Sequence, residues 1–175
     1  MKVVWLTPER MDLAPDSAVI WRSNPWFVPD DGKDWRVSLA VGCVVSRLGK
    51  HIAPKFARRY YDGIVVCAHP WAALSSAPSN DWWRDGAIVA GRTFECAGLP
   101  DEVVVTVSDG SQVFFNLDHL YEQLDLAVVR ASRLATIKTG DILAVQLPGD
   151  PIPVTEGTDF TVHVDTERAL LFKTR

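Results

Sequence analysis

The chain has 175 residues, a net charge of -4 at pH 7 and 47% hydrophobic residues. This length suits one domain with a hydrophobic core, and we expect residues 1–175 to form it, with 1–34 as a shortened N-terminal segment. The acidic balance, without a block of basic residues, argues against a nucleic-acid partner. No apolar run approaches the ~20 residues of a membrane span, so we expect no membrane partner. The start of the sequence does not have the pattern of a signal peptide, so we expect a cytoplasmic protein.

In the first half of the chain, apolar and β-branched runs between turn residues predict strands. These runs cover residues 2–6, 17–21, 35–45 and 64–68. Pro54 fits the first turn of a helix over 55–62, and Gly63 fits the left-handed position that ends a helix. The segment 71–83 is rich in Ser, Pro and Asn and predicts a loop.

The second half predicts more strands and one long helix. The strand runs cover residues 88–94, 102–107, 112–115, 161–164 and 168–172. The Asp109-Gly110 pair between two of them is typical of a type I′ hairpin turn. Apolar residues recur at helical spacing over 117–133, and Asn116 is a suitable N-cap for this helix.

Few residue types carry an obvious chemistry. The cysteines show neither a disulfide framework nor a CxxC pair, so we expect free buried thiols at Cys43, Cys67 and Cys96. Three histidines lack metal-ligand spacing and are expected at the surface: His51, His119 and His163. His69 shares a strand face with Cys67, a spacing that could serve a soft metal, although zinc sites usually bring three or four ligands. No nucleophile elbow or phosphate-binding glycine loop is present.

Two segments carry a resemblance to a known family. One is Val37–Trp71, which contains the helix end Arg59-Tyr60-Tyr61-Asp62-Gly63, and the other is the strand start at Gly140-Asp141. With their flanks they resemble the fumarylacetoacetate hydrolase (FAH) family over residues 16–70 and 85–172. The resemblance implies a mixed α+β, mostly β fold, an FAH-type β-roll or sandwich with strands around one long helix.

The resemblance also implies where a site would lie. Members of that family bind Mg, Ca or Mn through a Glu-x-Glu pair and an Asp, and use a Lys and a Gly-Thr-Pro threonine nearby. The matching positions hold Ser38, Ala40, His69, Trp82 and Leu147. A hard divalent cation needs carboxylate oxygens, so the resemblance implies that the metal site is lost and that the chain holds no cofactor. The lid motif of the family is also missing from residues 1–34.

Two functional hypotheses follow. The first is a catalytically inactive FAH-like homologue, a pseudoenzyme that acts as a homodimer or as the partner of an active paralogue, with an unidentified small-molecule ligand. The alternative is an active hydrolase or lyase for a small oxo-acid or diketone, with a site rebuilt near His69. Trp71, Trp82 and Trp83 form an aromatic group that fits either a plugged pocket or a protein contact.

Overall fold

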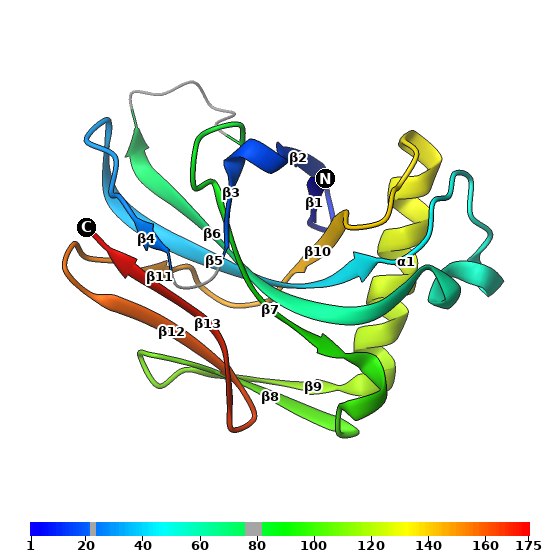
Figure 1. The fold of residues 1–175 in the computed structure, drawn as a ribbon. Coiled ribbons are helices and arrows are strands. Elements are labelled where there is room, and N and C mark those ends of the chain that lie inside the picture. Colours follow the sequence, from blue (N-terminus) through cyan, green and yellow to red (C-terminus); the bar gives the residue numbers. More distant parts are fainter. Residues whose placement is uncertain (22–23, 76–81) are drawn as a thin grey trace.

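The computed structural model describes residues 1–21, 24–75 and 82–175, which form two β-sheets, one α-helix and three short 3-10 helices (Figure 1). The strands of the first sheet are β1 (Lys2–Leu6), β2 (Met11–Pro15), β3 (Val19–Trp21), β5 (Gly32–Val45), β6 (Tyr61–Ser75), β7 (Ile88–Glu95), β10 (Ile142–Gln146) and β11 (Ile152–Pro153). Those of the second are β4 (Pro25–Trp26), β8 (Glu102–Val107), β9 (Gln112–Asn116), β12 (Asp159–Val164) and β13 (Glu167–Thr174). The helices are η1 (Asp16–Ala18), η2 (Pro54–Tyr60), η3 (Cys96–Gly98) and α1 (Leu117–Leu134).

The first sheet is curled into a roll. Its strand order is β2-β1-β10-β5-β6-β7-β3, with β11 beside β5. The two edge strands, β2 and β3, follow one another in the sequence with only the three residues of η1 between them. Because so short a connection cannot cross a flat sheet, the sheet must bend until its edges approach, as Figure 1 shows at the top of the molecule.

The two faces of this sheet bury two separate clusters of apolar residues. The outer face packs against α1 and the second sheet and forms the main core. The inner face encloses a second cluster, which we call the roll interior. Its buried residues are Val3, Trp5, Ala14, Ala18, Ala40, Val65, Cys67, Trp82, Ala87, Ile88, Ala90, Ile142 and Ala144.

The second sheet runs in the order β4-β13-β12-β8-β9 and lies against the first below β7 (Figure 1). The two sheets approach closely where Gly91 of β7 meets β13. A Cβ atom at Gly91 would clash with the backbone oxygen of Ala169, so a glycine is required for this close contact.

The predicted fold class is confirmed: the structure is mostly strands, with one long helix. Helix α1 begins where the sequence predicts, and the Asn116 side chain accepts a hydrogen bond from the His119 backbone N–H at 3.2 Å. No helix among the described residues is long and apolar enough to cross a membrane.

Two local predictions were wrong. A short helix does form near 55–62, as the 3-10 helix η2 with Pro54 in its first turn, but it does not end at Gly63, which lies inside β6 without a positive φ angle. Pairing of Gly63 with Val44 of β5 holds it in an extended conformation. The hairpin turn before β9 is not type I′, because Gly110 has a φ of 88° while Asp109 has no positive φ. The turn instead matches a type I turn followed by a glycine bulge.

Two strands exceed the prediction. The predicted loop 71–83 begins inside β6, which continues to Ser75 in register with β5, and residues 76–81 lie outside the described residues. Strand β2, which ends at Pro15, is not among the predicted strand runs. It forms as the sheet edge, pairing with β1 on one side only, and a proline at such an edge costs no ladder hydrogen bond.

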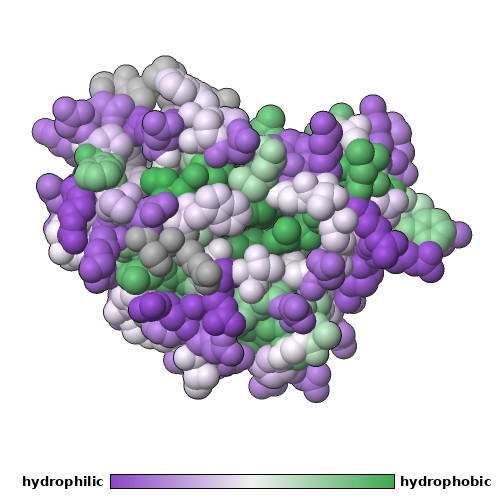
Figure 2. All heavy atoms as spheres, viewed as in Figure 1, coloured by the Kyte–Doolittle hydropathy of each residue, from purple (hydrophilic) through white to green (hydrophobic). Residues whose placement is uncertain are grey.

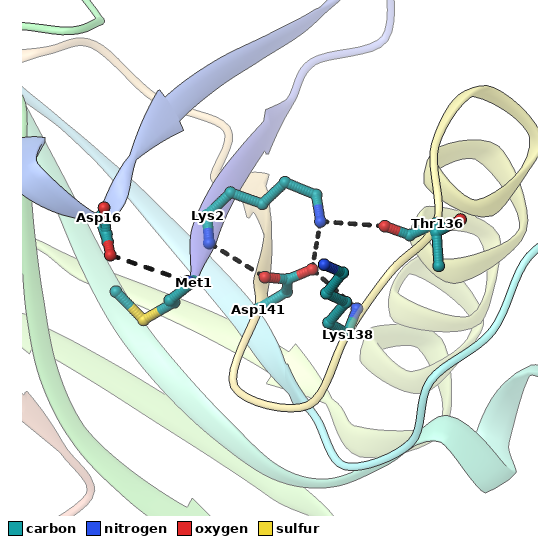
Figure 3. A network of polar contacts seen from close by, with 6 residues as sticks. All are labelled: Met1, Lys2, Asp16, Thr136, Lys138 and Asp141. Carbon is teal, nitrogen blue, oxygen red and sulfur yellow. Dashed lines mark hydrogen bonds and ion pairs between the residues drawn. The ribbon is translucent and has the colours of Figure 1, made fainter.

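A buried carboxylate fixes the start of β10 to β1. The Asp141 side chain, 2% exposed, accepts hydrogen bonds from the backbone N–H groups of Lys2 at 3.0 Å and Lys138 at 2.8 Å (Figure 3). The Lys2 ammonium also contacts Asp141 and donates to the Thr136 carbonyl at 3.1 Å. The sequence marks Asp141 only as part of the strand start Gly140-Asp141, whereas the structure makes its carboxylate the acceptor that joins two strands far apart in the chain.

Candidate functional site: the roll interior

The roll interior brings together four of the five positions that the sequence marked as a candidate site. Ser38 and Ala40 lie on β5, directly opposite His69 and Cys67 of β6. Positions two apart on a strand share a face, so these side chains point into the roll together. Trp82 belongs to the same cluster as Ala40 and stacks on His69.

Small residues on the middle strands leave room for two indole rings. Ala40, Ala90 and Ala144 are each fully buried and contribute only a methyl group. Trp5 and Trp82 fill the space above them, with ring centroids 5.8 Å apart. Trp82 is 6% exposed. Aromatic rings therefore fill the interior beside Ser38, Ala40 and His69, the positions that match the metal ligands of the FAH family.

His69 is held in one orientation by its surroundings. Its Nδ1 atom lies 2.7 Å from the Ala87 carbonyl oxygen. A carbonyl oxygen only accepts, so Nδ1 carries the proton in this contact. The imidazole lies 3.9 Å from the Trp82 ring, centroid to centroid, with the planes 16° apart, and 5.6 Å from the ring of Trp5. At 8% exposure, the His69 ring is one layer in an aromatic stack.

Two further hydrogen bonds line the roll. The Trp71 indole N–H donates to the Ser38 hydroxyl at 3.0 Å, so the Ser38 oxygen has a defined partner. The Trp5 indole N–H donates to the side-chain oxygen of Gln146 at 2.9 Å. Sequence reasoning missed Trp5 and Gln146. The available signal was the small residue Ala144, which lies on β10 with Gln146 and pairs with Trp5 of β1.

The fifth predicted position lies apart. Leu147 belongs to the main core, on the other side of the sheet from the roll interior. Its backbone N–H donates to the Leu39 carbonyl at 2.8 Å. Leu147 and Ser38 share only the lining of a groove of about 550 Å³ between β5, β9 and residues 146–152.

The residues of the roll interior do not fit a divalent metal of the FAH type. A hydroxyl, a methyl group and one imidazole stand at positions 38, 40 and 69, and a hard cation binds oxygen ligands, largely carboxylates. Within the described residues, no group of three or more His, Cys, Asp or Glu side chains could hold a metal ion. Burial raises the pKa of the Cys67 thiol to about 12, which disfavours the thiolate that a soft metal binds.

The two remaining aromatic positions differ in their surroundings. Trp71 is partly buried on β6, whereas Trp83 is 67% exposed. The aromatic group that the sequence placed in one loop therefore divides into a strand residue, a buried residue and a surface residue. Apolar residues on the face drawn in Figure 2 gather in patches inside a mainly hydrophilic rim.

Comparison with solved structures identifies the fold. A 5-carboxymethyl-2-hydroxymuconate delta-isomerase from Mycobacterium smegmatis superposes with a TM-score of 0.76 at 16% identity, covering 99% of this chain and 78% of the isomerase. A fumarylpyruvate hydrolase from Pseudomonas aeruginosa, solved with Mn2+ and pyruvate, gives 0.74 at 15% identity, with 99% and 88% covered. A Yersinia pestis protein assigned to the fumarylacetoacetate hydrolase family gives 0.76 at 16%, with 99% and 92% covered.

The chain therefore has the fold of the FAH family, and proteins that share this fold include isomerases and hydrolases. No protein-family model matches the sequence. No curated protein matches it either. Identities near 15% establish a shared fold and leave the chemistry of the site to be judged from its own residues.

Proposed function

We propose that this protein is a catalytically inactive homologue of FAH-fold enzymes, which acts by binding or by pairing with another chain. The main support for the proposal is that aromatic and small apolar side chains fill the roll interior. Trp82 lies against His69, and Ala40 replaces a ligand position of the family with a methyl group. A protein that retains the strand framework and fills its centre with apolar side chains keeps the scaffold without its metal chemistry.

The loss of charge is the main physical argument. In FAH-type chemistry the metal polarises an enolate oxygen of the substrate, which requires a bound cation as the electrophile. The residues at positions 38, 40 and 69 remove roughly three negative charges from the ligand set. A site of neutral groups cannot offset the cost of taking a divalent ion out of water.

The alternative hypothesis, an active hydrolase or lyase rebuilt around His69, has weaker support. A general base must come within hydrogen-bond reach of the proton that it removes. The His69 ring is stacked on Trp82, and its Nδ1 proton is directed at a backbone carbonyl. A substrate would have to displace the indole before it could reach the imidazole face.

Turnover of a small oxo-acid tests the proposal. Fumarylpyruvate is incubated with the purified protein and Mn2+, with the Pseudomonas aeruginosa fumarylpyruvate hydrolase as positive control. We expect no loss of substrate above the uncatalysed rate. Turnover by the wild-type protein that disappears in His69→Ala would overturn the proposal and favour the rebuilt site.

We further propose that pairing with a second copy uses strand β9, the last strand of the second sheet. The Val107 backbone N–H donates to the Ser111 carbonyl at 2.9 Å, and antiparallel pairs alternate in their hydrogen bonding. Val113 and Phe115 therefore bond toward β8, whereas the backbone groups of Gln112 and Phe114 point to the open side. No described strand pairs with this edge of β9, and an unpaired strand edge is a template for another strand.

The composition of β9 suits such pairing. The sequence Gln112–Asn116 carries no charge, so two copies can lie antiparallel without like-charge repulsion. The Phe114 side chain is 69% exposed. In an antiparallel pair centred on Phe114, the two phenyl rings would be neighbours and would cover one another.

The variant Phe114→Glu tests this surface, and Phe27→Glu is a matched control because Phe27 is also 69% exposed. Light scattering after size exclusion should give a dimer mass for the wild type and F27E, and a monomer mass for F114E. A dimer that persists in F114E, or a wild type that is monomeric at all concentrations, would contradict the β9 interface.

A further inference from the structure

A second concavity, outside the roll interior, combines apolar walls with a cation. Its volume is about 320 Å³, and it lies between α1, the end of β10 and the turn after β1. Its lining residues are Leu6, Thr7, Pro8, Gln123, Leu126, Ala127, Arg130, Val145 and Gln146. We call it the Arg130 pocket. Its size is near the lower end for small-molecule sites.

The cation in this pocket has only a neutral partner. Arg130 is partly buried, and its Nη1 donates to the Thr7 carbonyl oxygen at 3.2 Å. Among the described residues, no carboxylate forms an ion pair with Arg130. By contrast, Arg58 pairs with Asp125 and Arg92 with Glu167. A guanidinium has five N–H donors arranged for bidentate binding of a carboxylate, and one carbonyl contact uses a single donor.

The rest of the lining is apolar or uncharged. The Gln146 side chain lies on the roll side of β10, where its oxygen accepts the Trp5 indole proton at 2.9 Å, so Arg130 is the charged group of this pocket among the described residues. Leu126 of α1 is 50% exposed, and with Leu6 and Val145 it provides the apolar wall of the pocket. None of the described residues that line the pocket is Asp or Glu.

We propose that the Arg130 pocket binds a small carboxylate with a short aliphatic tail. The carboxylate pairs with the Arg130 guanidinium, and the tail lies against Leu6, Leu126 and Val145. This site is on the α1 side of the sheet and uses none of the residues Ser38, Ala40 or His69. The proposal is therefore independent of whether the roll interior is catalytic, and either can fail without the other.

Titration of the 15N-labelled full chain with acetate, propionate and butyrate tests this site. We expect saturable shift changes at amides around Thr7 and Leu126, and an affinity that rises about fourfold with each added CH2. Butanol, which has the tail without the charge, should give no saturable change at the same concentrations. An affinity that does not change with tail length, equal binding of butanol, or no saturable shifts would each overturn the proposal.

The variant Arg130→Met keeps the apolar stem and removes the charge, and Arg133→Met is the control because Arg133 is exposed on the same helix. We expect butyrate affinity to fall by about tenfold or more in R130M and to stay unchanged in R133M. Equal butyrate affinity in R130M and the wild type would overturn the role of Arg130. If R130M does not fold, the series of tail lengths on the wild type still decides the proposal.

Discussion

Truncation of Trp82 should destabilise the protein strongly, because this indole fills the roll interior. The ring is 6% exposed and stacks on His69 at 3.9 Å. Its neighbours Ala40 and Ala90 are too small to collapse into the space that Trp82→Ala would leave. We therefore expect a loss of about 3–5 kcal/mol in the free energy of unfolding, the range for buried aromatic residues.

The adjacent residue provides the control. Trp83 is 67% exposed, so Trp83→Ala should change the unfolding free energy by less than about 0.5 kcal/mol. Equilibrium urea denaturation is followed by far-UV circular dichroism, since either change removes a fluorophore. Similar unfolding free energies for W82A and W83A would refute the filled interior, because Trp82 would then not be a core residue.

A ligand can also report the space that W82A opens. An apolar cavity inside a protein stays dry and takes up aromatic molecules of matching size. Indole should therefore raise the melting temperature of W82A in a saturable way, since a ligand of the native state stabilises it. The wild type and W83A should show no such rise. A rise of the same size in W83A would show that indole binds elsewhere.

Three further predictions concern other parts of the structure. Asp141→Asn should cost about 3 kcal/mol of unfolding free energy by urea denaturation, at the low end for a broken buried pair because its lysine partner is 21% exposed. Iodoacetamide at pH 8 should modify Cys96 before Cys43 or Cys67. Burial raises the pKa of all three thiols, but Cys43 and Cys67 are fully buried whereas Cys96 is partly exposed. Mass spectrometry checks the order of modification. Burial and a neighbouring carboxylate raise the pKa of Tyr61, so wild-type stability should fall as the pH rises above about 10, and Tyr61→Phe should remove that part of the fall.

The sequence predicts the elements whose signals are local. Apolar spacing over 117–133 and the Asn116 cap identify α1, and the runs on either side of Ser108–Ser111 identify β8 and β9. These signals depend on residues within one or two turns of each other. The same is true of β12 and β13, where the predicted runs fall within the observed hairpin.

Strand β6 shows why other elements could not be predicted. The predicted strand ends at residue 68, yet β6 continues through Pro70, which pairs with Val37 of β5. The ladder between β6 and β7 ends at Ala68 and Val89. Beyond Ala68, the described part of β7 does not pair with β6. Pro70 lacks a backbone N–H, and this costs no hydrogen bond where β6 has no partner on that side. This follows from strand order, which the local sequence does not contain.

The candidate site likewise contains residues that the sequence could mark and residues that it could not. The resemblance to the FAH family marked Ser38, Ala40, His69 and Trp82, and the structure places these four together. Trp5 is next to them because β1 lies beside β10, a parallel pairing between chain segments about 140 residues apart. Leu147 lies apart because it faces the main core rather than the roll.

Binding of Mn2+ tests the central claim most directly. Free Mn2+ gives a strong electron paramagnetic resonance signal that weakens when the ion is bound to a protein. With the wild-type chain in excess, we expect the full signal of free Mn2+, because Ser38, Ala40 and His69 supply no carboxylate. Loss of the signal with a stoichiometry of one ion per chain, reversed by His69→Ala, would contradict the account and place a metal inside the roll.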